Sequence, residues 1–346
     1  MQNRLGIDMG GATISVAAPG RGLILQDPAV IAVERESGRV LAAGAMAEQK
    51  LNTSDRRVSL TRPFTNGFMG SPDEIGVLIT SCLANTGCMG DTDLILSVPC
   101  DISDEDEERL GRIADAAGAA SCHLVYAPLA AMAGTFLRLP AGCLVVDIGA
   151  TSTNVMLLCR GRIYYMKTIR VGGQTFDRSI ADYLWKRRKI RVSLRTAETI
   201  KMKIGSVWAG ATGKTMEAVG KDASGREVKF RVSSPDLYDS LEQPLADILE
   251  AVFFAVSKIP SEFVSGVFEL GIQLTGGGAL LDGIDRMIGG VTGVPTTRVD
   301  DPVGCTALGL AEMFDILPED LPPSFRNVSE IYIKHAGLPG QGDYDE

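Results

Sequence analysis

The sequence predicts an α/β protein made of two similar lobes, each with a mixed sheet and a smaller inserted subdomain. The main observation is a motif that occurs twice, since Leu5–Thr13 (LGIDMGGAT) is echoed by Leu144–Ser152 (LVVDIGATS). In each copy an apolar run ends in Asp-x-Gly, and an Arg-Gly pair follows thirteen residues after the Asp. Strand-like and helix-like segments then succeed one another in the same order after both copies. This self-similarity indicates a duplicated half-domain.

Length and composition indicate a globular protein with enough apolar material for two cores. The chain has 346 residues, of which 45% are hydrophobic and 22% charged. Its net charge of −9 argues against a protein that binds nucleic acid by neutralising phosphates. No run of 18 apolar residues predicts a transmembrane helix, and a first strand starting near Leu5 leaves no room for a signal peptide. Seven cysteines without CxxC spacing and two histidines predict reduced cytosolic thiols in the core and no zinc site.

The first half of the chain is predicted to begin with a meander of short strands. Apolar alternation bounded by turn residues predicts strands over 5–9, 14–18, 22–25, 29–33, 40–43, 94–98 and 124–125. Apolar residues at helical spacing and runs of small residues predict helices over 72–83, 103–118 and 128–137. Ser103 marks the start of the middle helix, because a serine followed by acidic residues is a typical N-cap and complements the helix dipole.

The second half repeats this order after the second Asp-x-Gly copy. Strands are predicted over 143–148, 153–159, 163–169 and 271–274, and helices over 176–185, 197–203, 237–258 and within 299–314. Residues 209–234 resemble a polar hairpin whose turn is Asp222–Gly225. We therefore expect lobe I over 1–140 with an inserted subdomain at about 34–66, and lobe II over 141–315 with one at about 178–246. The tail, 316–346, is expected to return in part to lobe I and to be partly disordered near its end.

The two Asp-x-Gly turns suggest a ligand. Glycine-bearing turns allow a ligand to approach the backbone closely, and a carboxylate precedes each turn. Two such turns facing each other across a cleft suit a clamp on a metal-bound phosphate chain.

Five ordered segments over about 300 residues carry a resemblance to a known family. They are Ile7–Gly10, Val145–Gly149, Arg195–Glu198 with Ile200-Lys201 and Ile204–Ser206, Leu274–Leu281, and Asp301-Pro302 with Cys305–Gly309. In these segments the chain resembles the MreB family of bacterial actin homologues, within the actin, Hsp70 and sugar-kinase superfamily, over residues 4–315. The resemblance implies a duplicated RNase H-like actin fold of four subdomains that binds ATP or ADP with Mg²⁺. It also implies homopolymer filaments in the cytoplasm that guide cell-wall synthesis and cell shape, with cell-wall elongation proteins at the inner membrane surface as partners.

The resemblance assigns roles to particular residues. Asp8 and Asp147 are expected to face the metal and its waters, because Mg²⁺ binds one or two carboxylates plus phosphate oxygens. The backbone of two turns is expected to hold the β- and γ-phosphates: Gly10, Gly11 and Ala12, and Gly149, Ala150 and Thr151. Thr275, Gly276, Gly277 and Gly278 are expected near the α-phosphate and adenosine, and Glu198 and Lys201 near the ribose and base. The plainer alternatives are that Asp8 only caps a turn and that Glu198 and Lys201 form an exposed ion pair.

Three departures from the family pattern predict weak hydrolysis. In the family an acidic pair precedes the proline that here is Pro128, and its second acid positions the attacking water, but this chain has Ala127 at that place. The second turn usually reads Asp-x-Gly-Gly-Gly-Thr, whereas here Ala150 and Thr151 replace two of the glycines. The β-branched side chain of Thr151 is expected to resist positive φ and close approach of the backbone to a ligand. Gly11 stands where a threonine is usual. We expect a divergent paralogue that binds nucleotide and is at most a slow ATPase.

Membrane attachment and competing functions are left open by the sequence. The segment 1–4 is too short for an amphipathic helix, and the loop 85–93 offers only Cys88 and Met89 as apolar side chains. A non-polymerising nucleotide-binding adaptor of the same superfamily is the main alternative to a filament protein. A sugar or acetate kinase is disfavoured, because no acid is evident as a base for a hydroxyl substrate.

Overall fold

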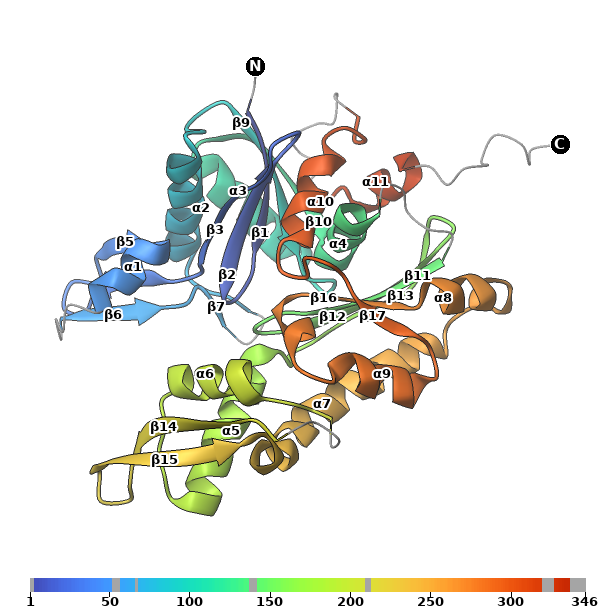
Figure 1. Cartoon of the computed structure of the whole chain (residues 1–346). Coiled ribbons are helices and arrows are strands. Elements are labelled where there is room, and N and C mark those ends of the chain that lie inside the picture. Colours follow the sequence, from blue (N-terminus) through green and yellow to red (C-terminus); the bar gives the residue numbers. More distant parts are fainter. Residues whose placement is uncertain are drawn as a thin grey trace. The chain divides into compact units, whose positions relative to one another are not determined.

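The computed structural model describes residues 3–51, 57–65, 68–136, 142–208, 213–318 and 327–336. The chain divides into two compact units. Unit 1 consists of Met1–Ala141, Leu158–Ile163 and Val303–Glu346, and unit 2 of Gly142–Leu157 and Tyr164–Pro302. The segment 303–315, expected in lobe II, is thus grouped with unit 1. Figure 1 labels the elements of both units.

Unit 1 is built on a five-stranded mixed sheet. Its strands are β1 (Asn3–Met9), β2 (Thr13–Ala18), β3 (Gly22–Pro28), β9 (Thr92–Val98) and β10 (Ala119–Tyr126), in the order β10-β9-β1-β2-β3. The pairs β1–β9 and β9–β10 are parallel, whereas β1–β2 and β2–β3 are antiparallel. The strands predicted over 5–9, 14–18, 22–25 and 94–98 are therefore confirmed, each one to three residues longer than expected. The strand predicted over 124–125 is also present, but it is eight residues long and begins at Ala119.

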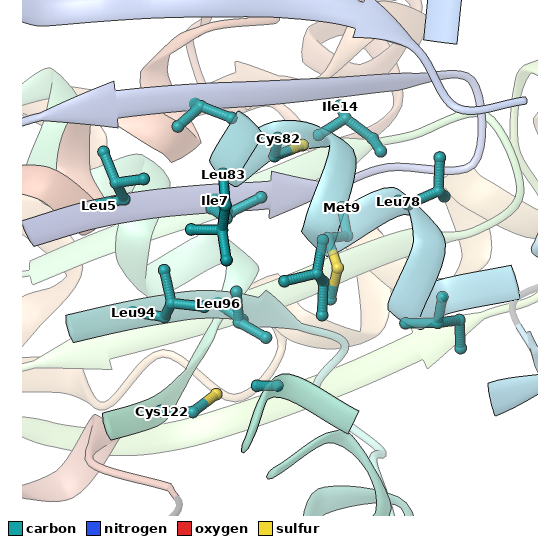
Figure 2. Packing of buried hydrophobic residues seen from close by; sticks show 14 of the residues in the cluster. Leu5, Ile7, Met9, Ile14, Leu78, Cys82, Leu83, Leu94, Leu96 and Cys122 are labelled. Carbon is teal, nitrogen blue, oxygen red and sulfur yellow. The ribbon is translucent and has the colours of Figure 1, made fainter. Parts of the chain in front are cut away.

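Two helix layers cover this sheet because its strands are apolar on both sides. Leu5 and Ile7 pack into a core with α2 (Pro72–Thr86), as Figure 2 shows. Gly6 faces the opposite way, where a Cβ would lie 2.6 Å from the Cβ of Leu310 in α10 (Cys305–Met313). The helix α10 also crosses α4 (Ala127–Thr135) closely, since a Cβ on Gly309 would overlap the Ala130 carbonyl oxygen. This packing explains why 303–315 belongs to unit 1.

The remaining elements of unit 1 are an inserted sheet with one helix, a short hairpin and two further helices. The insertion contains β4 (Ile31–Glu34), β5 (Val40–Ala43) and β6 (Val58–Thr61) in the order β5-β4-β6, with α1 (Gly44–Leu51). A short hairpin follows, β7 (Phe64–Thr65) with β8 (Phe68–Met69). The helix α3 (Asp104–Ala116) begins as predicted, because the Ser103 side chain accepts a hydrogen bond from the Asp106 N–H. In the tail, α11 (Ser329–His335) attaches to β10, where the Tyr126 N–H donates to the Ser329 hydroxyl at 3.0 Å.

Unit 2 repeats the sheet of unit 1. Its strands are β11 (Gly142–Ile148), β12 (Thr153–Cys159), β13 (Arg162–Ile169), β16 (Ile272–Thr275) and β17 (Thr296–Arg298), in the order β13-β12-β11-β16-β17. In both sheets the first strand is central, the next two extend to one side, and the two later strands lie on the other side. This shared order agrees with the duplication that the sequence predicts.

Helices and one hairpin complete unit 2. The helices are α5 (Gly173–Arg188), α6 (Leu194–Ile204), α7 (Ser234–Val256), α8 (Val264–Leu270) and α9 (Ile284–Thr292), with short 3₁₀ turns η1 (Ser261–Phe263) and η2 (Gly277–Leu280). The predicted hairpin is confirmed as β14 (Thr215–Lys221) and β15 (Glu227–Ser233). In the described ranges no single helix is long and apolar enough to cross a bilayer, although α7 and 261–270 pass that test as a pair bent by 101°.

Two further expectations concern the cysteines and the apolar side chains of the loop 85–93. All seven cysteines are free and buried, as predicted. The loop after α2 presents even less apolar surface than its two apolar side chains could offer, because Cys88 is only 5% exposed and packs into the core, whereas Met89 is 59% exposed.

Candidate functional site

Asp8 lies near the carboxyl end of β1, the central strand of unit 1. The neighbouring strand β9 is parallel to β1, so the carboxyl ends of the two strands lie at the same edge of the sheet. Ser97 of β9 uses this proximity, since its hydroxyl donates to Asp8 Oδ1 at 2.5 Å and accepts from the Met9 N–H at 3.3 Å. Asp8 is half-buried. Its carboxylate is therefore oriented at the sheet edge while part of it stays accessible to a ligand.

The turn after Asp8 is tight and is held by hydrogen bonds to its carbonyl oxygens. The Gly10 N–H donates to the Thr13 carbonyl at 3.0 Å, and a Cβ on Gly10 would lie 2.7 Å from that same oxygen, so only glycine fits. The Gly11 carbonyl accepts from Arg62 Nη1 at 3.3 Å, and the Ala12 carbonyl accepts from the Ala29 N–H at 2.8 Å. The turn is thus fixed to the rest of unit 1 through its carbonyl groups.

Asp147 occupies the equivalent place on β11 but in a different environment. It is buried, Asn154 Nδ2 donates to its Oδ2 at 3.3 Å, and the Thr275 hydroxyl donates to its Oδ1 at 3.2 Å. Burial raises the pKa of the Asp147 carboxyl, because an isolated negative charge is poorly solvated there, and the two hydrogen bonds offset this only in part. A nearby cation would favour the ionised form of such a carboxylate.

The turn after Asp147 docks on the N-terminus of α5. The carbonyls of Gly149 and Ala150 accept from the N–H groups of Gly173 and Gln174, at 2.9 and 2.8 Å. A Cβ on Gly172 would lie 2.8 Å from the Ala150 carbonyl oxygen, so this contact requires glycine. The first N–H groups of α5 are therefore used to hold the turn.

Thr151 does not strain this turn, contrary to expectation. Among the described residues, those with positive φ other than glycine are Asp91, Arg160 and Lys189, and no glycine of either Asp-x-Gly turn has positive φ. Thr151 is buried in the turn with an ordinary backbone conformation. The expectation that its β-branched side chain opposes the turn geometry is therefore wrong, because the turn does not use the left-handed region.

The glycine-rich turn Thr275–Gly278 packs directly against the Asp147 turn. Gly276 has a φ of +77°, and a Cβ there would overlap the Ile148 carbonyl and approach Asp147 Oδ1 to 2.7 Å. Gly278 packs on the Ile148 side chain, whereas a Cβ on Gly277 would meet nothing within 4 Å. Gly276 and Gly278 are thus needed for contacts within unit 2, and Gly277 is the glycine that leaves open space for a ligand.

Lys201 and Glu198 lie on α6 but do not pair with each other. Lys201 Nζ lies 2.8 Å from Asp177 Oδ1 and donates to the Gly173 carbonyl at 2.8 Å. Both side chains are mostly buried, at 15% exposure for Lys201 and 5% for Asp177. The ammonium group therefore ties α6 to the start of α5, beside the second turn. The alternative of an exposed Glu198–Lys201 ion pair is wrong.

The position expected to carry a catalytic acid holds Ala127, which is the first residue of α4. It is buried and follows β10 directly. The phenol of the preceding Tyr126 cannot replace the missing acid as a base, because burial and the Glu107 charge raise its pKa above the usual value. Where the structure describes side chains, no group of three or more His, Cys, Asp or Glu residues is arranged to hold a metal ion. A cation bound at either carboxylate would need phosphate oxygens and water as further ligands.

Some residues of this arrangement were not singled out from the sequence. Ser97, Asn154 and Asp177 each contact a predicted site residue. Ser97 is the single polar residue of the apolar run Leu94–Val98 in β9, and this isolation is a signal that could have identified it. Asn154 gave a weaker signal, because it follows three other polar residues, 151–153, at the start of β12. Asp177 gave no such signal, because it lies on a helix among other polar residues.

The sequence and the fold are similar to those of known proteins. A family model described as "MreB/Mbl protein" matches residues 2–320. "Cell shape-determining protein MreB" of Escherichia coli (strain K12) is 31% identical over 333 residues, covering 92% of this chain and 96% of that protein. "Cell shape-determining protein Mbl" of Bacillus cereus is 28% identical over 324 residues, covering 91% and 97%.

Solved structures agree with these relatives. MreB5 of Spiroplasma citri bound to ADP superimposes with a TM-score of 0.84 at 24% identity, covering 91% of this chain and 96% of that chain. A MamK double helical filament gives a TM-score of 0.78 at 17% identity, covering 91% and 100%. These likenesses confirm the predicted actin fold with two mixed-sheet lobes. Together with the match of the family model over most of the sequence, they show that the chain belongs to the MreB/Mbl family of actin-like proteins.

Proposed function

We propose that this chain binds ATP and ADP with Mg²⁺ and assembles into cytoskeletal filaments that guide cell-wall synthesis and cell shape. The observation that carries the proposal is the repeated construction of the two turns. In each unit a carboxylate ends the central strand, a compact turn follows it, and a hydroxyl from the neighbouring parallel strand donates to that carboxylate. The proposal is further supported by the Spiroplasma citri MreB5 structures with ADP and AMPPNP and by the MamK filament.

The residues present fit a magnesium nucleotide. Asp8 and Asp147 offer hard oxygen ligands for the cation or its water shell, and Mg²⁺ would neutralise charge on the phosphates. Of the two turns Gly10–Ala12 and Gly149–Thr151, the later N–H groups would hold the phosphates, because those of Gly10 and Gly149 already donate to the Thr13 and Ser152 carbonyls. Thr275–Gly278 would receive the α-phosphate and adenosine beside open Gly277. Glu198 would bind the ribose. Lys201 would act mainly by holding α6 against Asp177, since its ammonium group is already occupied there.

We infer that hydrolysis is slow because of Ala127. Alanine has no group that could orient or deprotonate water at the start of α4, and the loss of such a group commonly costs about 100-fold or more in rate. An Ala127→Glu variant should raise the single-turnover rate of ATP hydrolysis by about tenfold or more. An Ala127→Gln variant, similar in size, is the control for a purely steric effect. Brisk hydrolysis by the unaltered protein would contradict this inference.

Calorimetry and electron microscopy test the proposal at separate steps. ADP and ATP should bind in the presence of Mg²⁺, and Asp8→Ala and Asp147→Ala should each weaken binding while the protein stays folded. Filaments should form with ATP at micromolar protein concentration. Nucleotide binding without filaments would favour the adaptor function instead. Absence of nucleotide binding by well-folded protein would refute the proposal as a whole. We place the protein in the cytoplasm with elongation proteins as partners, which co-purification on filaments would test.

A further inference from the structure

A row of hydrogen-bonded polar side chains crosses four adjacent strands of the unit 2 sheet. The Thr168 hydroxyl on β13 donates to Asn154 Oδ1 on β12 at 2.7 Å, and Asn154 Nδ2 donates to Asp147 Oδ2 on β11 at 3.3 Å. From the other side, the Thr275 hydroxyl on β16 donates to Asp147 Oδ1 at 3.2 Å. Asn154, Asp147 and Thr275 are all buried. The row therefore ends on the carboxylate of the proposed cation site from both directions.

The row has a defined direction, and the carboxylate of Asp147 sets it. Because an ionised carboxylate only accepts hydrogen bonds, the amide nitrogen of Asn154 faces Asp147, and its amide oxygen is left to accept from the Thr168 hydroxyl. A flipped amide would bring its oxygen against the carboxylate oxygen and lose the hydrogen bond to Asp147. Each oxygen of Asp147 then has one side-chain donor, so the plane of the carboxylate is fixed before any ligand binds.

We propose that Asn154 is a positioning residue of the cation site, acting through Asp147 and held in place by its hydrogen bond to Thr168. This inference rests on the proposed binding of a magnesium nucleotide. A carboxylate that is already fixed loses less conformational freedom on binding a cation or its waters, so its affinity is higher. Partners that orient metal-binding groups in this way typically contribute 10- to 100-fold to metal affinity.

The inference differs from a purely structural role in what it predicts. A buried polar row can serve only to satisfy its own hydrogen bonds, and its loss would then lower stability without changing how Mg²⁺ affects nucleotide binding. A positioning role predicts instead a loss specific to magnesium. The quantity that separates the two is the ratio of ADP affinity with Mg²⁺ to ADP affinity in EDTA.

Four variants of the full chain measure that ratio by calorimetry, beside the thermal midpoint of the nucleotide-free protein. Asn154→Leu, similar in volume, should lower the ratio by about tenfold. Thr168→Val should lower it by a smaller factor, and Thr168→Ser should restore it because the hydroxyl is retained. Gln273→Met is the matched control, since Gln273 is a buried amide of the same sheet that donates to the Leu270 carbonyl instead. It should leave the ratio within about twofold of the unaltered protein.

Specific outcomes would overturn the inference. A ratio unchanged within twofold in folded Asn154→Leu would show a structural role only, as would equal losses with Mg²⁺ and in EDTA. If Asn154→Leu does not fold, Thr168→Val decides, because it leaves Asn154 in place, and an unchanged ratio there overturns the inference. Binding of ADP by the unaltered protein with no magnesium dependence would overturn it while leaving nucleotide binding intact. Absence of ADP binding by the unaltered protein would instead refute the proposed function.

Discussion

The two Asp-x-Gly turns occupy the same place in two similarly ordered sheets, yet their carboxylates have different surroundings. Asp8 is half-buried and accepts from the hydroxyl of Ser97. Asp147 is buried, with one donor on each oxygen from Asn154 and Thr275. The duplication has thus kept the backbone position of the carboxylate and changed its solvation. Burial raises the pKa of the Asp147 carboxyl, so a bound cation would stabilise its ionised form.

The groups that donate hydrogen bonds to the carbonyl oxygens of the two turns also differ. The carbonyls of the first turn accept from the Arg62 side chain and the Ala29 N–H, whereas those of the second accept from the first N–H groups of α5. The start of α5 is in turn held by Lys201 through the Gly173 carbonyl and Asp177. The second turn therefore depends on a chain of buried contacts, and changes in that chain should cost more than changes around the first turn.

The largest effect should follow from Lys201→Met. This change leaves the buried Asp177 carboxylate without its cation, and breaking a buried ion pair from one side typically costs about 3–5 kcal/mol. Urea denaturation should show this loss in the free energy of unfolding, and ADP binding should weaken because the second turn loses its anchor. Lys203→Met, on the exposed face of α6, should cost less than about 0.5 kcal/mol.

A double variant tests whether the loss in Lys201→Met comes from the buried charge of Asp177. Adding Asp177→Asn to Lys201→Met removes the uncompensated charge and should recover part of the lost stability. A loss below about 1 kcal/mol in Lys201→Met would show that this anchor matters no more than a surface ion pair.

A smaller but still clear effect is expected at Gly276. An alanine there would have to adopt a φ of +77° and would overlap the Ile148 carbonyl, which together should destabilise unit 2 by about 2–3 kcal/mol. Gly277→Ala is the matched control, because a Cβ at that position meets no atom within 4 Å. It should alter the free energy of unfolding little while reducing nucleotide affinity. Equal destabilisation by both changes would contradict the distinction between a packed and an open glycine.

The backbone positions of these turns could be predicted from sequence, and their side-chain environments could not. Asp8, Asp147 and Gly276 stand at the ends of apolar runs, so the local pattern placed them at strand ends. The two hydrogen-bond partners of Asp147, Asn154 and Thr275, follow it in the sequence by seven and by 128 positions. Only the order of the strands in the sheet brings both of them to Asp147. Solvation and hydrogen bonding of a carboxylate depend on that tertiary order, which no local pattern contains.

The helix in the tail also depends on tertiary contacts that the local sequence does not reveal. The sequence predicts that the tail returns in part to lobe I but places no helix there, whereas α11 forms against β10. The end of the tail, where disorder is expected, lies outside the described residues. The Val328 N–H donates to the Leu124 carbonyl, and Tyr332 is buried, with a pKa that burial and the Glu312 charge raise to about 12. Contacts with an edge strand distant in sequence stabilise this short helix, whereas its own propensity does not.

The two carboxylates should respond differently to Asn substitution in nucleotide-free protein. Asp147→Asn removes a charge that burial disfavours and should stabilise the protein by on the order of 1 kcal/mol, whereas Asp8→Asn should have little effect. Because the pKa of Asp147 is raised on folding, the penalty is absent below about pH 3.8, grows as the pH rises above that value, and levels off above the pKa of the folded state. The advantage of Asp147→Asn, measured by urea denaturation, should therefore be smallest below about pH 3.8 and should increase as the pH is raised above it. An advantage of equal size for Asp8→Asn would contradict the proposed difference in solvation.

The smallest effect is expected at Arg62, which supports the first turn through one hydrogen bond to the Gly11 carbonyl at 3.3 Å. Arg62→Met keeps the aliphatic stem and removes the donor, so the free energy of unfolding should fall by about 1 kcal/mol or less. ADP affinity should fall only slightly, because the Ala29 N–H still holds the Ala12 carbonyl and Ser97 still orients Asp8. Arg62→Lys, which retains a charge with a different donor geometry, separates the hydrogen bond from the charge. A loss in Arg62→Met as large as that in Lys201→Met would mean that the first turn, too, depends on a single buried anchor, and the contrast between the two turns would then be limited to their carboxylates.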